Sequence, residues 1–76
     1  MGSWSYGLVR DKEGIKVREV YFNEKKKIFA YADLDWKQYF INPFMIIKDI
    51  YSQLKNLGVL DYERDIKGNK PNWEKR

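Results

Sequence analysis

Residues 42–58 have the sequence NPFMIIKDIYSQLKNLG, which carries the signals for both ends of one helix. Asn42 is a preferred N-cap residue, and Pro43 suits the first helical position because the N–H that it lacks has no partner there. Gly58 is the residue type that most often follows the last helical turn. These signals predict a helix over about 43–57.

Apolar side chains recur along this helix at intervals of three and four residues. The predicted stripe contains Phe44, Ile47, Ile50, Tyr51, Leu54 and Leu57. Lys48, Ser52 and Lys55 are expected on the opposite side. Because an amphipathic helix normally buries its apolar side, we expect the stripe to pack against the rest of the protein.

The chain before the helix alternates between apolar and polar residues, which is typical of strands. Three strands are predicted, at about 3–10, 15–22 and 27–32. Short polar segments separate them, so we expect an antiparallel meander. Asn23 suits the left-handed conformation that the second turn often needs. Glu19, on a largely apolar strand face, is expected to pair with Arg10 or Lys27 across the sheet.

Two segments complete the predicted architecture. Within the ambiguous segment 33–41, residues 33–35 resemble a loop, and residues 36–41 fit a short strand, a helical turn or a packed loop equally well. The chain from residue 61 onward contains nine charged residues, so we expect a compact domain over 1–62 and a charged, mobile tail over 63–76. The predicted fold class is α+β, with a three-stranded antiparallel sheet packed in two layers against one helix.

Composition excludes several classes of function. The chain has 76 residues, no cysteine and no histidine, so disulfides, thiol nucleophiles and histidine-based catalysis are absent from it. We therefore expect no enzyme activity, no cofactor and no metal, and interpret Asp33 and Asp35 as loop residues. The lack of cysteine favours a reducing, cytoplasmic location. The longest run without charges, 38–47, is far below the roughly 20 residues of a membrane span.

Two short motifs carry a resemblance. Residues 4–10, WSYGLVR, and residues 18–23, REVYFN, resemble a group of small uncharacterised bacterial and phage-type proteins. In that group a W-x-Y-x-hydrophobic strand precedes an E-V-Y-[YF]-[DN] strand, a hairpin and an amphipathic helix. The resemblance implies the same order of elements and a bacterial or phage origin. It implies no site.

Aromatic and basic residues are the remaining functional signal. Aromatics make up 17% of the chain, which has a net charge of +4. We expect many rings to form the core, and those on the sheet face that the helix leaves open to bind a partner. The predicted partner contacts are Trp4, Tyr6, Tyr21, Tyr31 and Trp36. The predicted electrostatic contacts are Arg10, Arg18, Lys25, Lys26 and Lys27.

The favoured hypothesis is a small non-enzymatic accessory or inhibitor protein that docks an aromatic, mildly basic sheet face on another protein. The alternative is a nucleic-acid-binding module, in which Lys25–Lys27 contact phosphates and strand aromatics stack on bases. A homodimer that buries the same rings is a further alternative.

Overall fold

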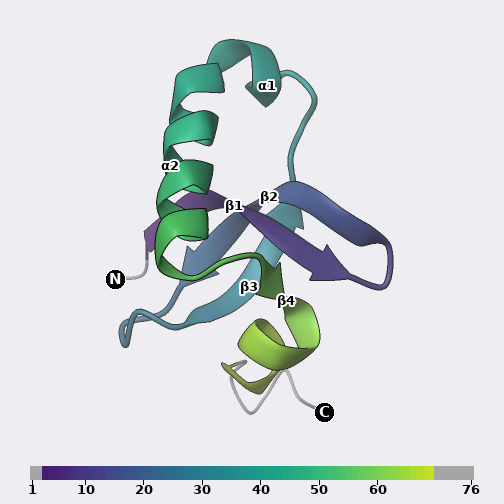
Figure 1. The fold of residues 1–76 in the computed structure, drawn as a ribbon, viewed down its shortest axis with the longest axis vertical. Coiled ribbons are helices and arrows are strands. Elements are labelled where there is room, and N and C mark those ends of the chain that lie inside the picture. The colour runs from purple at the N-terminus through teal and green to yellow at the C-terminus, as the bar shows by residue number, and fades with distance from the viewer. Residues whose placement is uncertain (1–2, 70–76) are drawn as a thin grey trace.

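The computed structural model describes residues 3–69, and four strands within them form one mixed sheet (Figure 1). β1 (Ser3–Asp11), β2 (Gly14–Phe22) and β3 (Ile28–Asp33) form the antiparallel meander that the alternating pattern predicts. A short strand, β4 (Leu60–Asp61), adds a parallel pairing to β1, which gives the order β3-β2-β1-β4. The α+β class is confirmed, but the sheet is mixed because the chain returns to the outer edge of β1.

The second hairpin differs from expectation in the role of Asn23. Its side-chain oxygen accepts hydrogen bonds from the backbone N–H groups of Lys25, at 2.9 Å, and Lys27, at 3.0 Å. Lys26, with φ 63°, takes the left-handed conformation instead. The prediction that Asn23 itself is left-handed is wrong, because Asn23 stabilises the turn through its side chain.

Two helices follow the sheet. α1 (Gln38–Ile41) settles the ambiguous segment as a helical turn, and α2 (Pro43–Asn56) matches the predicted helix closely. Gly58, with φ 76°, follows α2 in the conformation that favours glycine. Asn42 precedes α2 but makes no side-chain cap. Its backbone N–H instead donates to the Gln38 carbonyl, because α1 runs almost directly into α2.

The hydrophobic core lies on one face of the sheet. Its buried members are Val9, Val20, Ile28, Leu60 and Ile66. Ile66 belongs to a π-helical turn, η1 (Tyr62–Ile66), which a 3₁₀ turn, η2 (Lys67–Asn69), extends. The predicted domain boundary at residue 62 is therefore wrong, since Ile66 is fully buried in the core. The rest of the predicted tail, 70–76, lies outside the described residues.

The orientation of α2 contradicts the two-layer expectation. α2 packs against β1, and Figure 1 shows it standing along that side of the sheet. Its buried residues are Ile46 and Gln53, neither of which belongs to the predicted apolar stripe. Phe44 is 83% exposed and Ile47 64% exposed. Most of the stripe therefore faces solvent, and only Ile50 among its members is half-buried.

Candidate interaction surface

Polar side chains of α2 fix the helix to the edge of β1. Gln53 accepts a hydrogen bond from the Leu8 N–H through Oε1, at 2.7 Å, and donates to the Leu8 carbonyl through Nε2, at 2.9 Å. The same Nε2 donates to the Gly58 carbonyl, at 3.0 Å. One side-chain amide thus pairs with β1 as a neighbouring strand would. It also ties the end of α2 to the sheet.

Asp49 makes the second connection, one helical turn earlier. Its Oδ2 accepts a hydrogen bond from the Tyr6 N–H, at 3.1 Å. Since β4 pairs with β1 only at Val9 and Arg10, these two side chains of α2 satisfy backbone groups of β1 that β4 does not reach. Unpaired backbone groups at a buried edge are costly, so this requirement determines which side of α2 faces inward.

Gly7 permits this close approach. A Cβ atom built on Gly7 would lie 2.6 Å from the Gln53 Oε1 atom, closer than atoms pack without a shift. A glycine in a strand often marks a site where another group approaches the backbone. Gly7, Asp49 and Gln53 form one docking unit, and sequence reasoning missed all three. The signal that could have indicated this docking side is that Asp49 and Gln53 are polar, lie four positions apart and share one side of the helix with Ile46.

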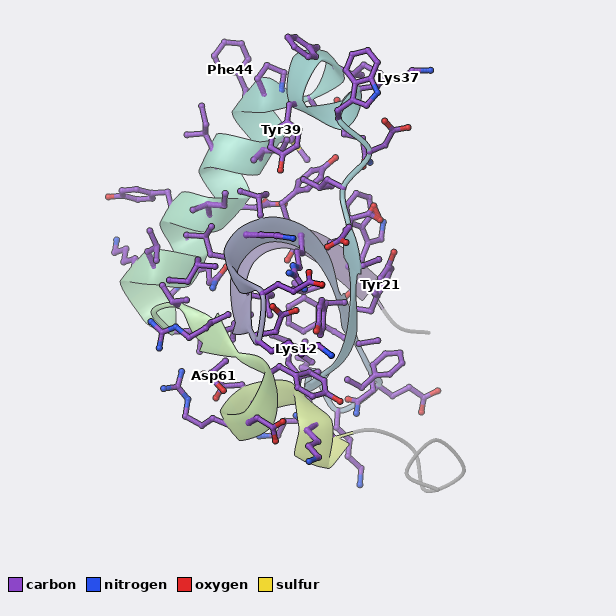
Figure 2. All side chains as sticks on the ribbon, turned by 90° about the vertical axis from the view of Figure 1, so that its right-hand side faces the viewer. Lys12, Tyr21, Lys37, Tyr39, Phe44 and Asp61 are labelled. Carbon is purple, nitrogen blue, oxygen red and sulfur yellow. The ribbon has the colours of Figure 1, made fainter. Side chains whose placement is uncertain are left out.

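With Ile46, Asp49 and Gln53 turned inward, α2 displays apolar residues to solvent. We define the helical apolar surface by exposed residues of α1, of α2 and of the position after α2, which are Phe40, Ile41, Phe44, Ile47, Tyr51, Leu54 and Leu57. Their exposed fractions range from 47% for Leu54 to 83% for Phe44. Figure 2 shows Phe44 projecting away from α2 and from the sheet.

The helical apolar surface is large for a protein of this size. Taking about 200 Å² for an aromatic side chain and about 120 Å² for an aliphatic one, the exposed fractions give about 750 Å² of accessible surface. The largest apolar patch on a typical monomer is about 300–600 Å² and is often functional. This area, which α1, α2 and the residue after α2 contribute, marks the surface as the strongest candidate site among the described residues.

Basic residues flank this surface. Lys48 and Lys55 each follow a stripe residue along α2 and are exposed. The only carboxylate of α2, Asp49, is engaged with the Tyr6 N–H on the inner side. Trp36, 65% exposed, packs edge-on against Phe40 with ring centroids 6.0 Å apart. Trp36 is therefore the one predicted partner contact that adjoins the helical apolar surface.

The other predicted aromatic contacts are dispersed. Tyr6 is 3% exposed and packs edge-on against Trp4, which is 51% exposed. Tyr21 is half-buried, and its hydroxyl donates to Glu19, at 2.8 Å, which raises the pKa of Tyr21. Glu19 thus pairs with Tyr21 and not with Arg10 or Lys27 as expected. Because Tyr6 is buried, it cannot serve as an exposed partner contact.

Arg18 is buried as well, which removes it from the predicted electrostatic contacts. Its guanidinium is 2% exposed and donates through Nη1 to Asp11 Oδ2, at 2.6 Å. The Nε atom lies 3.3 Å from Asp33. The predicted contact Tyr31 joins the same network, because its ring lies 4.8 Å from the guanidinium carbon and its hydroxyl donates to Asp11, at 3.0 Å. This network is structural.

The network makes Asp11 unusually acidic. The hydrogen bond from Arg18 is the main cause that lowers the Asp11 pKa from 3.8 to about 2. The hydrogen bonds from the Glu13 N–H and the Tyr31 hydroxyl add to the effect. Asp11 therefore stays charged at neutral and mildly acidic pH.

The remaining predicted cations lie on the surface. Arg10 and Lys25–Lys27 are exposed, the lysines at the turn between β2 and β3. Next to this turn, Trp4, Tyr21 and Phe29 line a shallow hollow of about 450 Å³. Trp4 and Tyr21 come together because they are paired across β1 and β2.

No group of three or more acidic side chains within residues 3–69 is arranged to hold a metal ion. No helix within that range is long and apolar enough to cross a membrane.

Comparison with protein families, with curated proteins and with solved structures finds no match to this chain. The resemblance to small bacterial and phage-type proteins therefore stays a prediction.

Proposed function

We propose that this chain is a non-enzymatic interaction protein that binds another polypeptide through the helical apolar surface. The observation that carries the proposal is the inverted orientation of α2, which exposes Phe44, Ile47 and Tyr51 while Asp49 and Gln53 face the sheet. Large apolar patches on soluble proteins usually mark interaction sites. Aromatic residues such as Tyr51 and Trp36 are frequent hot spots in interfaces.

The proposal moves the contact surface from the sheet to the helices. The sequence-based hypothesis assigned binding to aromatics of an open sheet face, but Tyr6 is buried and Tyr31 belongs to the Arg18 network. Trp36 is kept, since it adjoins Phe40. A helix that places apolar residues at intervals of three and four positions into a partner's groove, or onto a partner's helix, is a common recognition mode.

Site-specific photo-crosslinking tests this proposal. A photoreactive phenylalanine analogue is placed at Phe44 in the full chain expressed in cells, and the matched control carries it at Lys16, an exposed position on β2. We expect protein adducts from position 44, with either another chain or a second copy, and few from position 16. Equal yields at both positions, or none at position 44, would contradict the proposal.

A second function rests on the hollow beside the lysine turn. Trp4, Tyr21 and Phe29 line it together with Glu24, and Lys25–Lys27 come next in the turn. Aromatic rings beside cations suit single-stranded nucleic acid, whose bases stack while phosphates meet the lysines. Titration of tryptophan fluorescence with single-stranded DNA and RNA should then show binding that weakens as salt rises. No response at low salt would exclude this function.

A further inference from the structure

We infer that the polypeptide bound by the helical apolar surface is a second copy of this chain, packed α2 against α2. The inference rests on the proposed function, because it names the occupant of the same surface. Two features carry it, which are the spacing of the exposed residues along α2 and the area that they offer.

The spacing fits a helix as the partner. Phe44, Ile47, Tyr51 and Leu54 are separated by three, four and three residues, and all are about half exposed or more. Apolar residues at this spacing form the seam by which one helix packs against another. Since every copy of the chain carries the same seam on a helix already fixed to its sheet, two copies can meet in a symmetric, closed pair.

The area fits a stable dimer. The helical apolar surface offers about 750 Å² in each copy, close to the roughly 800 Å² per partner that a standard specific interface buries. A chain of 76 residues also gains more from association than a larger one, because a small core buries a smaller fraction of its surface. The surface therefore provides most of the area that a stable dimer needs.

The charges beside the seam give the dimer a distinctive response to salt. Each copy brings Lys48 and Lys55 but no carboxylate from α2, since Asp49 is engaged with β1. A pair of copies therefore has only weak repulsion between lysines near its seam, which salt screens. The affinity of the dimer should rise a few-fold with salt, whereas binding to an acidic partner would weaken.

Sedimentation velocity on the purified full chain, from low micromolar to several hundred micromolar, tests the inference. We expect a monomer–dimer equilibrium that shifts toward dimer as salt rises. Ile47→Lys should weaken dimerisation by at least about tenfold, which corresponds to roughly 1.4 kcal/mol. The matched control Ile15→Lys places the same change on β2, at a residue that is 50% exposed, and should leave the equilibrium unchanged.

The outcomes separate the inference from the proposed function. A wild-type protein that stays monomeric throughout, or an Ile15→Lys variant that weakens dimerisation as much as Ile47→Lys, overturns the inference. If the chain is monomeric while Phe44 still crosslinks to a different protein, the inference fails and the proposed function stands. If neither association nor crosslinking occurs, both fail. Circular dichroism of Ile47→Lys establishes that a loss of dimer is not a loss of fold.

Discussion

α2 turns polar side chains toward the sheet and apolar side chains toward solvent, which is the reverse of most helices that pack on a sheet. The inner side carries Asp49 and Gln53, which hydrogen-bond to the backbone of β1, and only Ile46 is a buried apolar residue there. The outer side carries Phe44 and Ile47, both largely exposed. Helices on the face of a sheet bury their apolar side because that face offers apolar partners.

The comparison shows what changes when a helix lies at an edge. The edge of β1 offers N–H and C=O groups, so the helix that covers it needs donors and acceptors. Gln53 supplies one of each to Leu8. The apolar side of α2 is then left without an intramolecular partner, and the same sequence pattern that would build a core builds a surface for association.

The largest expected effect comes from Gln53→Leu. This change is close to isosteric and would improve a helix packed on apolar residues. Here it leaves the Leu8 N–H, the Leu8 carbonyl and the Gly58 carbonyl without their partner. We expect the free energy of unfolding to fall by about 2–4 kcal/mol in urea denaturation. An unchanged or higher stability would show that the inner side of α2 does not depend on these hydrogen bonds.

Gly7→Ala tests the same contact from the strand. The added Cβ atom would meet the Gln53 Oε1 atom at 2.6 Å, so Gln53 must move and its bonds to Leu8 weaken. We expect a loss of about 1–3 kcal/mol by urea denaturation. Gly68→Ala, where a Cβ atom meets nothing within 4 Å, is the matched control. If Gln53→Ala does not reduce the cost of Gly7→Ala in the double variant, the coupling is absent.

The loss of stability at acid pH tests the Arg18 network, which is remote from both sides of α2. The Asp11 pKa is lowered to about 2, so the charged carboxylate stabilises the fold above about pH 4, and this contribution disappears as the pH falls from about 4 to 2. Asp11→Asn should be less stable than wild type at neutral pH and show a flatter stability profile over that window. Asp35→Asn, the same exchange on an exposed residue, should keep the wild-type profile. Parallel profiles for all three proteins would argue against the Arg18 network.

The smallest effect is expected on the outer side of α2. Leu54→Gln is the opposite exchange to Gln53→Leu and is made at the next residue, whose side chain is 47% exposed. At a protein concentration below that of self-association, the free energy of unfolding should change by less than about 0.5 kcal/mol. A loss comparable to that of Gln53→Leu would mean that the apolar side of α2 is buried within the monomer.

The sequence predicted those elements whose signals are local. The meander follows from strict alternation and polar turns, and α2 follows from Pro43, Gly58 and helical periodicity. The direction in which α2 faces is not local, because it depends on which groups of β1 are left open by β4. The short β4 carries no periodic signal of its own, and it was missed.

The candidate site shows the same division. Apolar spacing identified the stripe residues correctly but placed them in the core, since burial is the usual fate of such a stripe. Arg18 was predicted to be an electrostatic contact on the surface, but it is buried. Its partners are Asp11 of β1 and Asp33 of β3. Both strands pair with β2, which carries Arg18, and only this pairing brings the three residues together.

Thiol accessibility measures the orientation of α2 most directly, because the chain contains no cysteine. Single variants Ile46→Cys and Ile47→Cys place a thiol on adjacent residues that are 6% and 64% exposed. At a concentration too low for self-association, a thiol reagent should modify Ile47→Cys nearly as fast as the unfolded chain, and Ile46→Cys far more slowly. The reverse order would contradict the account, since it would place the apolar stripe against the sheet.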